Sequence, residues 1–176
     1  QSGIYLDCTI GAGGHSYGIL KKLSSSGQLI GLDSDETVLE PTHILFSVFN
    51  KNQYSLHHSN FYNFPKILQN LGIPKVNGIL FDLGLSSMEL DSSSRGFSFN
   101  INSPLDMRFD MSRGISAKDF LHNSTEKELQ EVINKFGEER NYKIISKSIY
   151  TFIKNYKMNT TYDLRDSILS VIPKNK

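Results

Sequence analysis

Residues 7–15 form the segment of the chain that is best suited to binding a ligand. They read Asp-Cys-Thr-Ile-Gly-Ala-Gly-Gly-His and follow a short apolar run. Glycines let the backbone approach a ligand and adopt positive φ angles, and a helix that begins here presents unpaired N–H groups. The dinucleotide fingerprint Gly-x-Gly-x-x-Gly fails, because Ser16 stands where its third glycine is required. The segment therefore predicts a turn that binds a ligand other than a dinucleotide. The alternative is a glycine-rich turn that binds no ligand.

The same segment matches acid-x-small-x-Gly-x-Gly, the first motif of S-adenosylmethionine (SAM) methyltransferases, with Thr9 at the small position. Asp33 follows Gly13 by 20 residues and ends the next apolar run. A carboxylate there can accept hydrogen bonds from both hydroxyls of a ribose, in SAM as in NAD. Asp82 ends a further apolar run. Together, Asp7, Asp33 and Asp82 would lie at the ligand-binding edge of a parallel sheet.

Four short apolar segments alternate with helical patterns in the first half of the chain. We expect strands at Ile4–Asp7, Gln28–Asp33, Tyr54–His58 and Val76–Leu83, with helices between them at 15–23, 37–49 and 65–71. Such alternation predicts βαβ units and a parallel sheet. The expected strand order is 3-2-1-4, which leaves the fourth strand as an unpaired edge.

The second half of the chain has a different character. Residues 85–115 are rich in Ser, Arg and Asp with little periodicity, which is typical of a functional or disordered segment. Helical patterns follow, and the first begins with a capping box at Thr125 and Glu128. We therefore expect an α/β fold with an all-α module. The predicted domains are a SAM-binding part at 1–111 and a helical, substrate-recognising module at 112–176.

Charge is distributed unevenly along the chain. Residues 1–134 carry 10 Lys and Arg against 14 Asp and Glu, whereas residues 135–176 carry 9 against 4. The basic segment predicts a nucleic-acid footprint, with a solvated helical face as the alternative. No run approaches the ~18 apolar residues of a membrane span. Cys8 is the only cysteine and His57 and His58 face opposite sides of a strand, so we expect no metal site.

Beyond Asp82, residues capable of chemistry are dense, and the chain resembles the MraW (RsmH) family of small-subunit ribosomal RNA cytosine-N4 methyltransferases. Six motifs carry the resemblance in order: Gly-Ala-Gly-Gly-His-Ser, Gly-Leu-Asp-Ser-Asp, Asp-Leu-Gly-Leu-Ser-Ser, Arg-Gly-Phe-Ser-Phe, Pro-Leu-Asp-Met-Arg and Gly-Glu-Glu-Arg. The resemblance implies a Rossmann-like SAM-dependent methyltransferase fold with a partial parallel sheet, SAM as cofactor and small-subunit rRNA as partner. Family members continue with further strands, so we expect this chain to be part of a longer protein.

The resemblance also implies a set of cofactor contacts. They are Gly13, Gly14, His15, Asp33, Phe61, Asp82 and Glu89. The family usually has Gln at the position of Glu89, and Phe61 suits packing against adenine. For catalysis we expect Asp82 to anchor the methionine amine, while Ser86, Ser87 and Asp106 line the target pocket. No general base is assigned.

RNA contacts are expected from arginines and aromatic residues of the second half. The candidates for gripping phosphate are Arg95, Arg108, Arg113 and Arg140. Phe97 or Phe99 could stack on an extruded base. For each of them, a loop-anchoring ion pair or an ordinary core aromatic is the alternative.

Three other functions stay open at the level of sequence. They are a SAM methyltransferase of another substrate, a nicotinamide oxidoreductase, which Ser16 disfavours, and a non-catalytic ribosome-assembly factor. We expect a bacterial cytoplasmic protein, with the mitochondrial matrix as the alternative, and leave a homodimer open.

Overall fold

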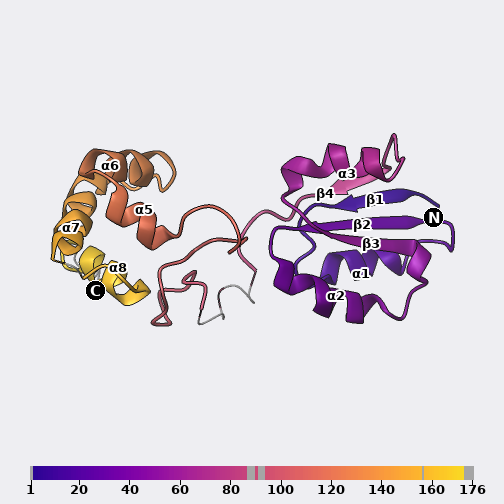
Figure 1. The fold of residues 1–176 in the computed structure, drawn as a ribbon, viewed down its shortest axis with the longest axis horizontal. Helices are drawn as coiled ribbons and strands as arrows, with labels where there is room; N and C mark the ends of the chain where they lie inside the picture. Colours follow the sequence, from indigo (N-terminus) through magenta and orange to yellow (C-terminus); the bar gives the residue numbers. More distant parts are fainter. Residues whose placement is uncertain (1, 87–89, 91–93, 156, 173–176) are drawn as a thin grey trace. The chain divides into compact units, whose positions relative to one another are not determined.

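The computed structural model describes residues 2–86, 90, 94–155 and 157–172. Its contacts divide the chain into two compact units, which are described separately (Figure 1). Unit 1 contains Gln1–Ser86 and Phe109–Met111, and unit 2 contains Ser87–Arg108 and Ser112–Lys176. Residues 87–108, placed with the N-terminal part in the sequence analysis, therefore group with the helices.

Unit 1 is built on a four-stranded parallel sheet with the order β3-β2-β1-β4. The strands are β1 (Ile4–Asp7), β2 (Gln28–Asp33), β3 (Tyr54–His58) and β4 (Gly78–Leu80). The register pairs Asp7 with Leu80 and Asp33 with His58, so the carboxyl ends of all four strands lie at one edge. The predicted order and the edge position of β4 are confirmed, whereas β4 is shorter than the predicted strand.

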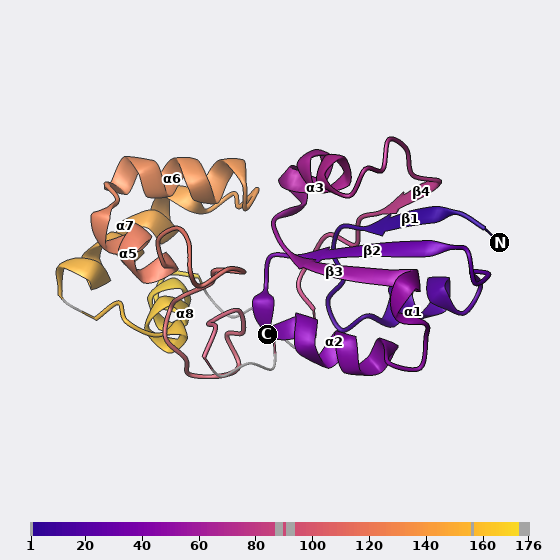
Figure 2. The same cartoon turned by 45° about the vertical axis from the view of Figure 1, so that its right-hand side comes forward.

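Helices cover both faces of this sheet (Figures 1 and 2). They are α1 (Gly14–Leu20) and α2 (Leu39–Phe46) on one face and α3 (Phe64–Asn70) on the other. Short 3₁₀ turns lie at Glu36–Val38, Lys51–Gln53 and Phe61–Asn63. Leu20 and Phe46 pack on the first face and Leu68 on the second, all within apolar clusters that include sheet residues. The result is a three-layer α/β unit of Rossmann-like topology.

Unit 2 contains the helices α5 (Ala117–Asn123), α6 (Glu126–Lys135), α7 (Tyr142–Lys154) and α8 (Thr161–Leu169). They pack around a core that includes Leu129, Ile145 and Ile149. The predicted capping box of α6 is confirmed, because Thr125 N donates to Glu128 at 2.8 Å and Glu128 N donates to Thr125 Oγ1 at 3.3 Å. Helix α5 was not predicted. None of the helices in the described part of the chain is long and apolar enough to cross a membrane.

The segment before α5 has little regular secondary structure but is well bonded to α8. The hydroxyl of Thr161 accepts from Ser103 N at 3.0 Å and donates to Ile101 O at 2.6 Å. Thr161 N donates to Ser103 O at 2.9 Å, and an isolated β-bridge joins Pro104 to Thr160. Because these bonds join residues almost 60 positions apart, part of the region predicted as a long loop is an ordered element of unit 2.

Candidate functional site

The glycine turn leaves β1 at the carboxyl edge of the sheet. Ile10 N donates to Leu32 O at 2.9 Å and Gly13 N donates to Ile10 O at 2.8 Å, so the turn folds back over the end of β2. Gly13 caps α1 with φ of 79°, a left-handed conformation that favours glycine. A side chain on Gly14 would meet nothing within 4 Å. The turn therefore presents an open backbone surface, which suits a ligand that approaches it closely.

Asp33 ties this turn to β2. Its Oδ2 atom accepts from Gly11 N at 2.8 Å, and its Oδ1 atom accepts from Asp35 N at 2.9 Å. Each carboxylate oxygen has further acceptor capacity, so both can still receive a ribose hydroxyl. The carboxylate is thus held in place before any ligand arrives, as a binding group should be.

Asp7 is buried, unlike Asp33 and Asp82, although all three acids were expected to share the ligand-binding edge. It is 1% exposed, and it accepts from Ser16 Oγ at 2.6 Å and Thr9 N at 3.0 Å. Burial raises its pKa above the ordinary 3.8, although these hydrogen bonds oppose the rise. Through these hydrogen bonds Asp7 holds Thr9 and the first turn of α1 in place from the buried side of the turn. Ser16, which excluded the dinucleotide fingerprint, has a defined role as its donor.

Asp82, which follows β4, and His15, at the start of α1, meet at the carboxyl edge of the sheet. His15 Nε2 lies 3.3 Å from Asp82 Oδ2, and both side chains are largely exposed. Asp82 N donates to Thr9 Oγ1 at 2.7 Å, which joins the chain after β4 to the turn after β1. An exposed carboxylate fixed in this way can bind an ammonium group. The open turn, Asp33 and Asp82 together fit SAM, which carries a ribose, an amine and a sulfonium charge.

Phe61 lies in the turn after β3 and is half-exposed. Its ring packs edge-to-face on Phe81, with centroids 5.7 Å apart at 90°. Phe81 directly precedes Asp82 and is also half-exposed, so two aromatic rings stand beside the acidic edge. Phe81 is not among the predicted site residues, and its only signal in the sequence is its position at the end of the fourth apolar run.

The remaining catalytic candidates belong to different units. Ser86 ends the main segment of unit 1, whereas Asp106 belongs to unit 2. Asp106 forms a two-pronged ion pair with Arg108, at 2.9 Å to Nε and 2.6 Å to Nη2, and the hydrogen bonds from Arg108 lower its pKa. Ser87 and Glu89 lie outside the described residues. The catalytic roles of Asp106 and Ser86 therefore stay predictions.

The arginines expected to grip phosphate differ in exposure. Arg113 and Arg140 are exposed. Arg95 is buried and donates from Nη2 to Arg108 O at 2.7 Å, and Arg108 is paired with Asp106. In this structure Arg95 and Arg108 thus follow the alternative reading, in which they anchor loops. Among the described residues, no three His, Cys, Asp or Glu side chains are grouped to hold a metal.

A glycine turn after β1, an acid ending β2, an acid after β4 and the order 3-2-1-4 define the class of Rossmann-like methyltransferases. The chain belongs to the MraW methylase family, whose model matches residues 1–176.

Individual relatives agree with this assignment. The chain is 45% identical to ribosomal RNA small subunit methyltransferase H of Caldicellulosiruptor saccharolyticus, over 99% of this chain and 56% of that protein. It is 41% identical to the protein of the same name from Clostridioides difficile, over 98% and 55% of the two chains. The Lachnospira eligens protein is 40% identical, over 97% and 54%. The chain spans about half the length of the curated relatives it matches.

Proposed function

We propose that this chain supplies the SAM site and an RNA-recognising helical unit of a methyltransferase acting on N4 of a cytidine in the decoding region of small-subunit rRNA. The observation that carries the proposal is the prearranged edge of unit 1, where Asp33 holds the glycine turn and Asp82 stands exposed beside His15. The family and the names of the relatives support the RNA substrate. The bacterial origin of the relatives supports a bacterial cytoplasmic location, and a homodimer is compatible with the proposal.

Each candidate residue has a role in the proposed site. Asp33 accepts the ribose hydroxyls, Asp82 binds the methionine amine, and Phe61 packs on the adenine. The backbone of Gly13 and Gly14, with His15, borders the methionine end, and Glu89 completes the set. SAM, when bound, supplies the methyl group from its sulfonium centre.

The target amine needs positioning above all, because its lone pair is delocalised into the cytosine ring. Ser86 and Asp106 are proposed to line the target pocket and to accept hydrogen bonds from the amine as positive charge develops on it. Replacement of Asp106 by Asn in a chain that methylates RNA tests its part. Full turnover by that variant would remove Asp106 from the mechanism.

Calorimetric titration with SAM tests the cofactor site directly. We expect saturable binding that is lost in Asp33→Ala and weakened in Asp33→Asn, which keeps one acceptor oxygen. Glu40→Ala is the matched control, because Glu40 is an exposed acid of the same unit on α2. NAD is the ligand control. Binding of NAD and not of SAM would contradict the methyltransferase proposal.

Substrate class needs a second assay. Methyl transfer from labelled SAM is compared between small ribosomal subunits, naked rRNA and total cell protein. Label in rRNA at a cytidine supports the proposal. Label in protein alone would favour a SAM methyltransferase of another substrate.

A further inference from the structure

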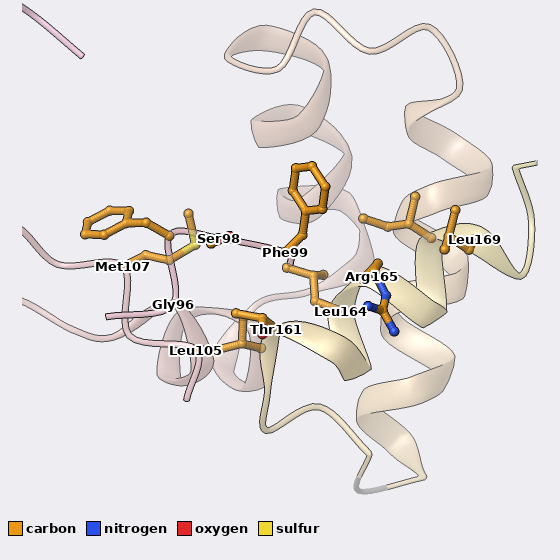
Figure 3. A pocket seen from close by; sticks show the side chains of 11 residues that line it. Gly96, Ser98, Phe99, Leu105, Met107, Thr161, Leu164, Arg165 and Leu169 are labelled. Atoms are coloured by element: carbon orange, nitrogen blue, oxygen red, sulfur yellow. The ribbon is translucent and has the colours of Figure 1, made fainter. Parts of the chain in front are cut away.

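Unit 2 contains a pocket that the proposed cofactor site does not use. It lies between α8 and the segment 96–107 and has a volume of about 290 Å³ (Figure 3). Its walls are mainly apolar. They include Phe97, Phe99 and Met107 from the segment and Leu164, Ile168 and Leu169 from α8. The volume is close to the lower end of the range for small-ligand sites, roughly 300 Å³.

The segment that forms one wall is held in a strained conformation. Met107 has φ of 59°, which is rare for a residue with a side chain. Met107 N donates to Arg95 O at 2.8 Å, and Arg95 Nη2 donates to Arg108 O at 2.7 Å. Gly96 has φ of 73°, and a side chain there would collide with Pro104 O. Strain that the surrounding contacts maintain in this way is concentrated at ligand sites.

The other wall is fixed to the same segment. Thr161, at the start of α8, exchanges hydrogen bonds with Ser103 and donates to Ile101 O, and Tyr162 Oη donates to Asn100 O at 3.1 Å. The pocket is therefore formed within unit 2 by contacts between described residues. The hydroxyl of Thr161 is already engaged, and Ser98 is the other hydroxyl-bearing residue of the lining. Because the lining is mainly apolar, the pocket selects mostly by shape and apolar surface.

A cation stands at the pocket in a fixed orientation. Arg165 binds Asp166 through Nε at 2.9 Å and through Nη2 at 2.8 Å. Its guanidinium lies 3.8 Å above the ring of Tyr162. Phe99 stands at the same pocket with 67% of its surface exposed, so an aromatic face is presented to solvent.

We propose that this pocket receives one unstacked nucleobase of the RNA. The proposal rests on the proposed function and extends it to a second binding site. A base has flat apolar faces that stack on aromatic rings in a sequence-tolerant way. The phosphates of the RNA backbone match the basic charge of residues 135–176, which carry 9 Lys and Arg against 4 Asp and Glu. The volume accommodates a single base and is too small for a helix of a protein partner.

The experiment measures equilibrium binding of the full 176-residue chain to a labelled single-stranded RNA that contains cytidine. Phe99→Ala is expected to weaken binding about tenfold, the usual effect of losing one base–aromatic stack. Phe99→Tyr keeps the stacking face and is expected to bind normally. SAM affinity, a property of unit 1, should not change in either variant.

Phe136→Ala is the matched control. Phe136 is 74% exposed at the end of α6, lies beneath Lys135 and does not line the pocket. If both alanine variants lose RNA affinity equally, the pocket is not the site. If Phe99→Ala changes only the melting temperature or the oligomeric state, another protein segment occupies the pocket and the inference is overturned.

Photocrosslinking locates the base directly. RNA carrying 5-iodocytidine is expected to crosslink to peptides that contain Phe97 or Phe99, and adducts found only elsewhere would overturn the inference. A chain that binds SAM and RNA but crosslinks elsewhere leaves the proposed function intact. A chain that binds SAM but no RNA contradicts both.

Discussion

Gly13 and Gly14 are neighbours, yet the structure requires glycine at only one of them. Gly13 has φ of 79°, and a Cβ atom there would lie 2.9 Å from Thr42 Cγ2. We expect Gly13→Ala to destabilise unit 1 by about 1–2 kcal/mol, the cost of a left-handed conformation with a side chain. Gly14 has open space, so Gly14→Ala should melt like the unaltered chain. It should nevertheless weaken SAM binding about tenfold, because the methyl group would occupy space that the ligand needs.

Thermal melts and calorimetry of these two variants separate the fold from the site. Normal SAM binding by Gly14→Ala would show that the ligand does not approach this glycine.

Asp7 should make stability depend on pH in an unusual direction. Burial raises its pKa above 3.8, so the folded state binds the proton more tightly than the unfolded state does. This contribution is fully present below pH ~3.8 and is lost as the pH rises through the higher folded pKa. Asp7→Asn cannot ionise, and its amide can still pair with Thr9 N and Ser16 Oγ. We therefore expect the melting temperature of Asp7→Asn, relative to the unaltered chain, to be higher at pH 7 than at pH 4.

The sign of the difference between the two pH values is the test, because burial fixes the direction of the pKa shift of Asp7. Melts followed by circular dichroism at both pH values check it. A variant that loses more stability at pH 7 than at pH 4 would mean that the ionised carboxylate is stabilising.

At the scale of elements, the local apolar patterns predicted the strands whose bounds depend on nearby residues alone. The bounds of β1, β2 and β3 match the predicted strands, because each apolar run ends at a polar residue. β4 stops at Leu80 because Asp82 N turns to Thr9 Oγ1 instead of extending the ladder. Helix α5 was missed although Ser116, which caps it by accepting from Asp119 N at 3.0 Å, was a readable signal.

In the candidate site, too, features set by local motifs were predictable and features set by distant contacts were not. The glycine turn and Asp33 could be predicted, because motif spacing places them at the ends of strands. The burial of Asp7, the contact of Phe61 with Phe81 and the pairing of Asp106 with Arg108 could not. Each of these depends on how segments distant in sequence, or a strained loop, come together in three dimensions.

Helix α7 carries an exposed lysine stripe that we define as Lys143, Lys147 and Lys154. The helix contains no acidic residue, and Ile145 and Ile149 are buried in the core. We expect the triple change to Gln to weaken RNA binding and to reduce the salt dependence of binding by about 2 in the log–log slope, since each phosphate contact with a single strand contributes about 0.7. Titrations at several salt concentrations measure both effects.

The matched control replaces three exposed lysines of unit 1 by Gln. They are Lys51, Lys66 and Lys75. An equal decrease in the salt-dependence slope of RNA binding in both triple variants would mean that the lysines of α7 make no specific phosphate contacts and contribute only to the net positive charge of the chain.

At the scale of the whole molecule, the two units have separate cores. Leu20, Leu29 and Phe46 belong to a cluster in unit 1, and Leu129 and Ile149 to a cluster in unit 2. The chain returns once to unit 1 at Phe109–Met111, where Asp110 Oδ2 lies 3.7 Å from His58 Nε2. Separate cores favour separate unfolding, because cooperativity depends on shared buried surface.

Scanning calorimetry should therefore resolve two transitions, and each ligand should move only one of them. SAM at 100 times its Kd adds about 2.7 kcal/mol to the unit that binds it, which corresponds to a rise of roughly 10–20 °C for unit 1. Single-stranded RNA should raise the other transition, and Phe99→Ala should reduce that effect. Asp33→Asn is the control, because it should weaken the response to SAM and leave the response to RNA unchanged. A single transition that SAM raises as a whole would mean that the two units unfold as one body, and ligand binding to unit 1 would then stabilise the helical unit as well.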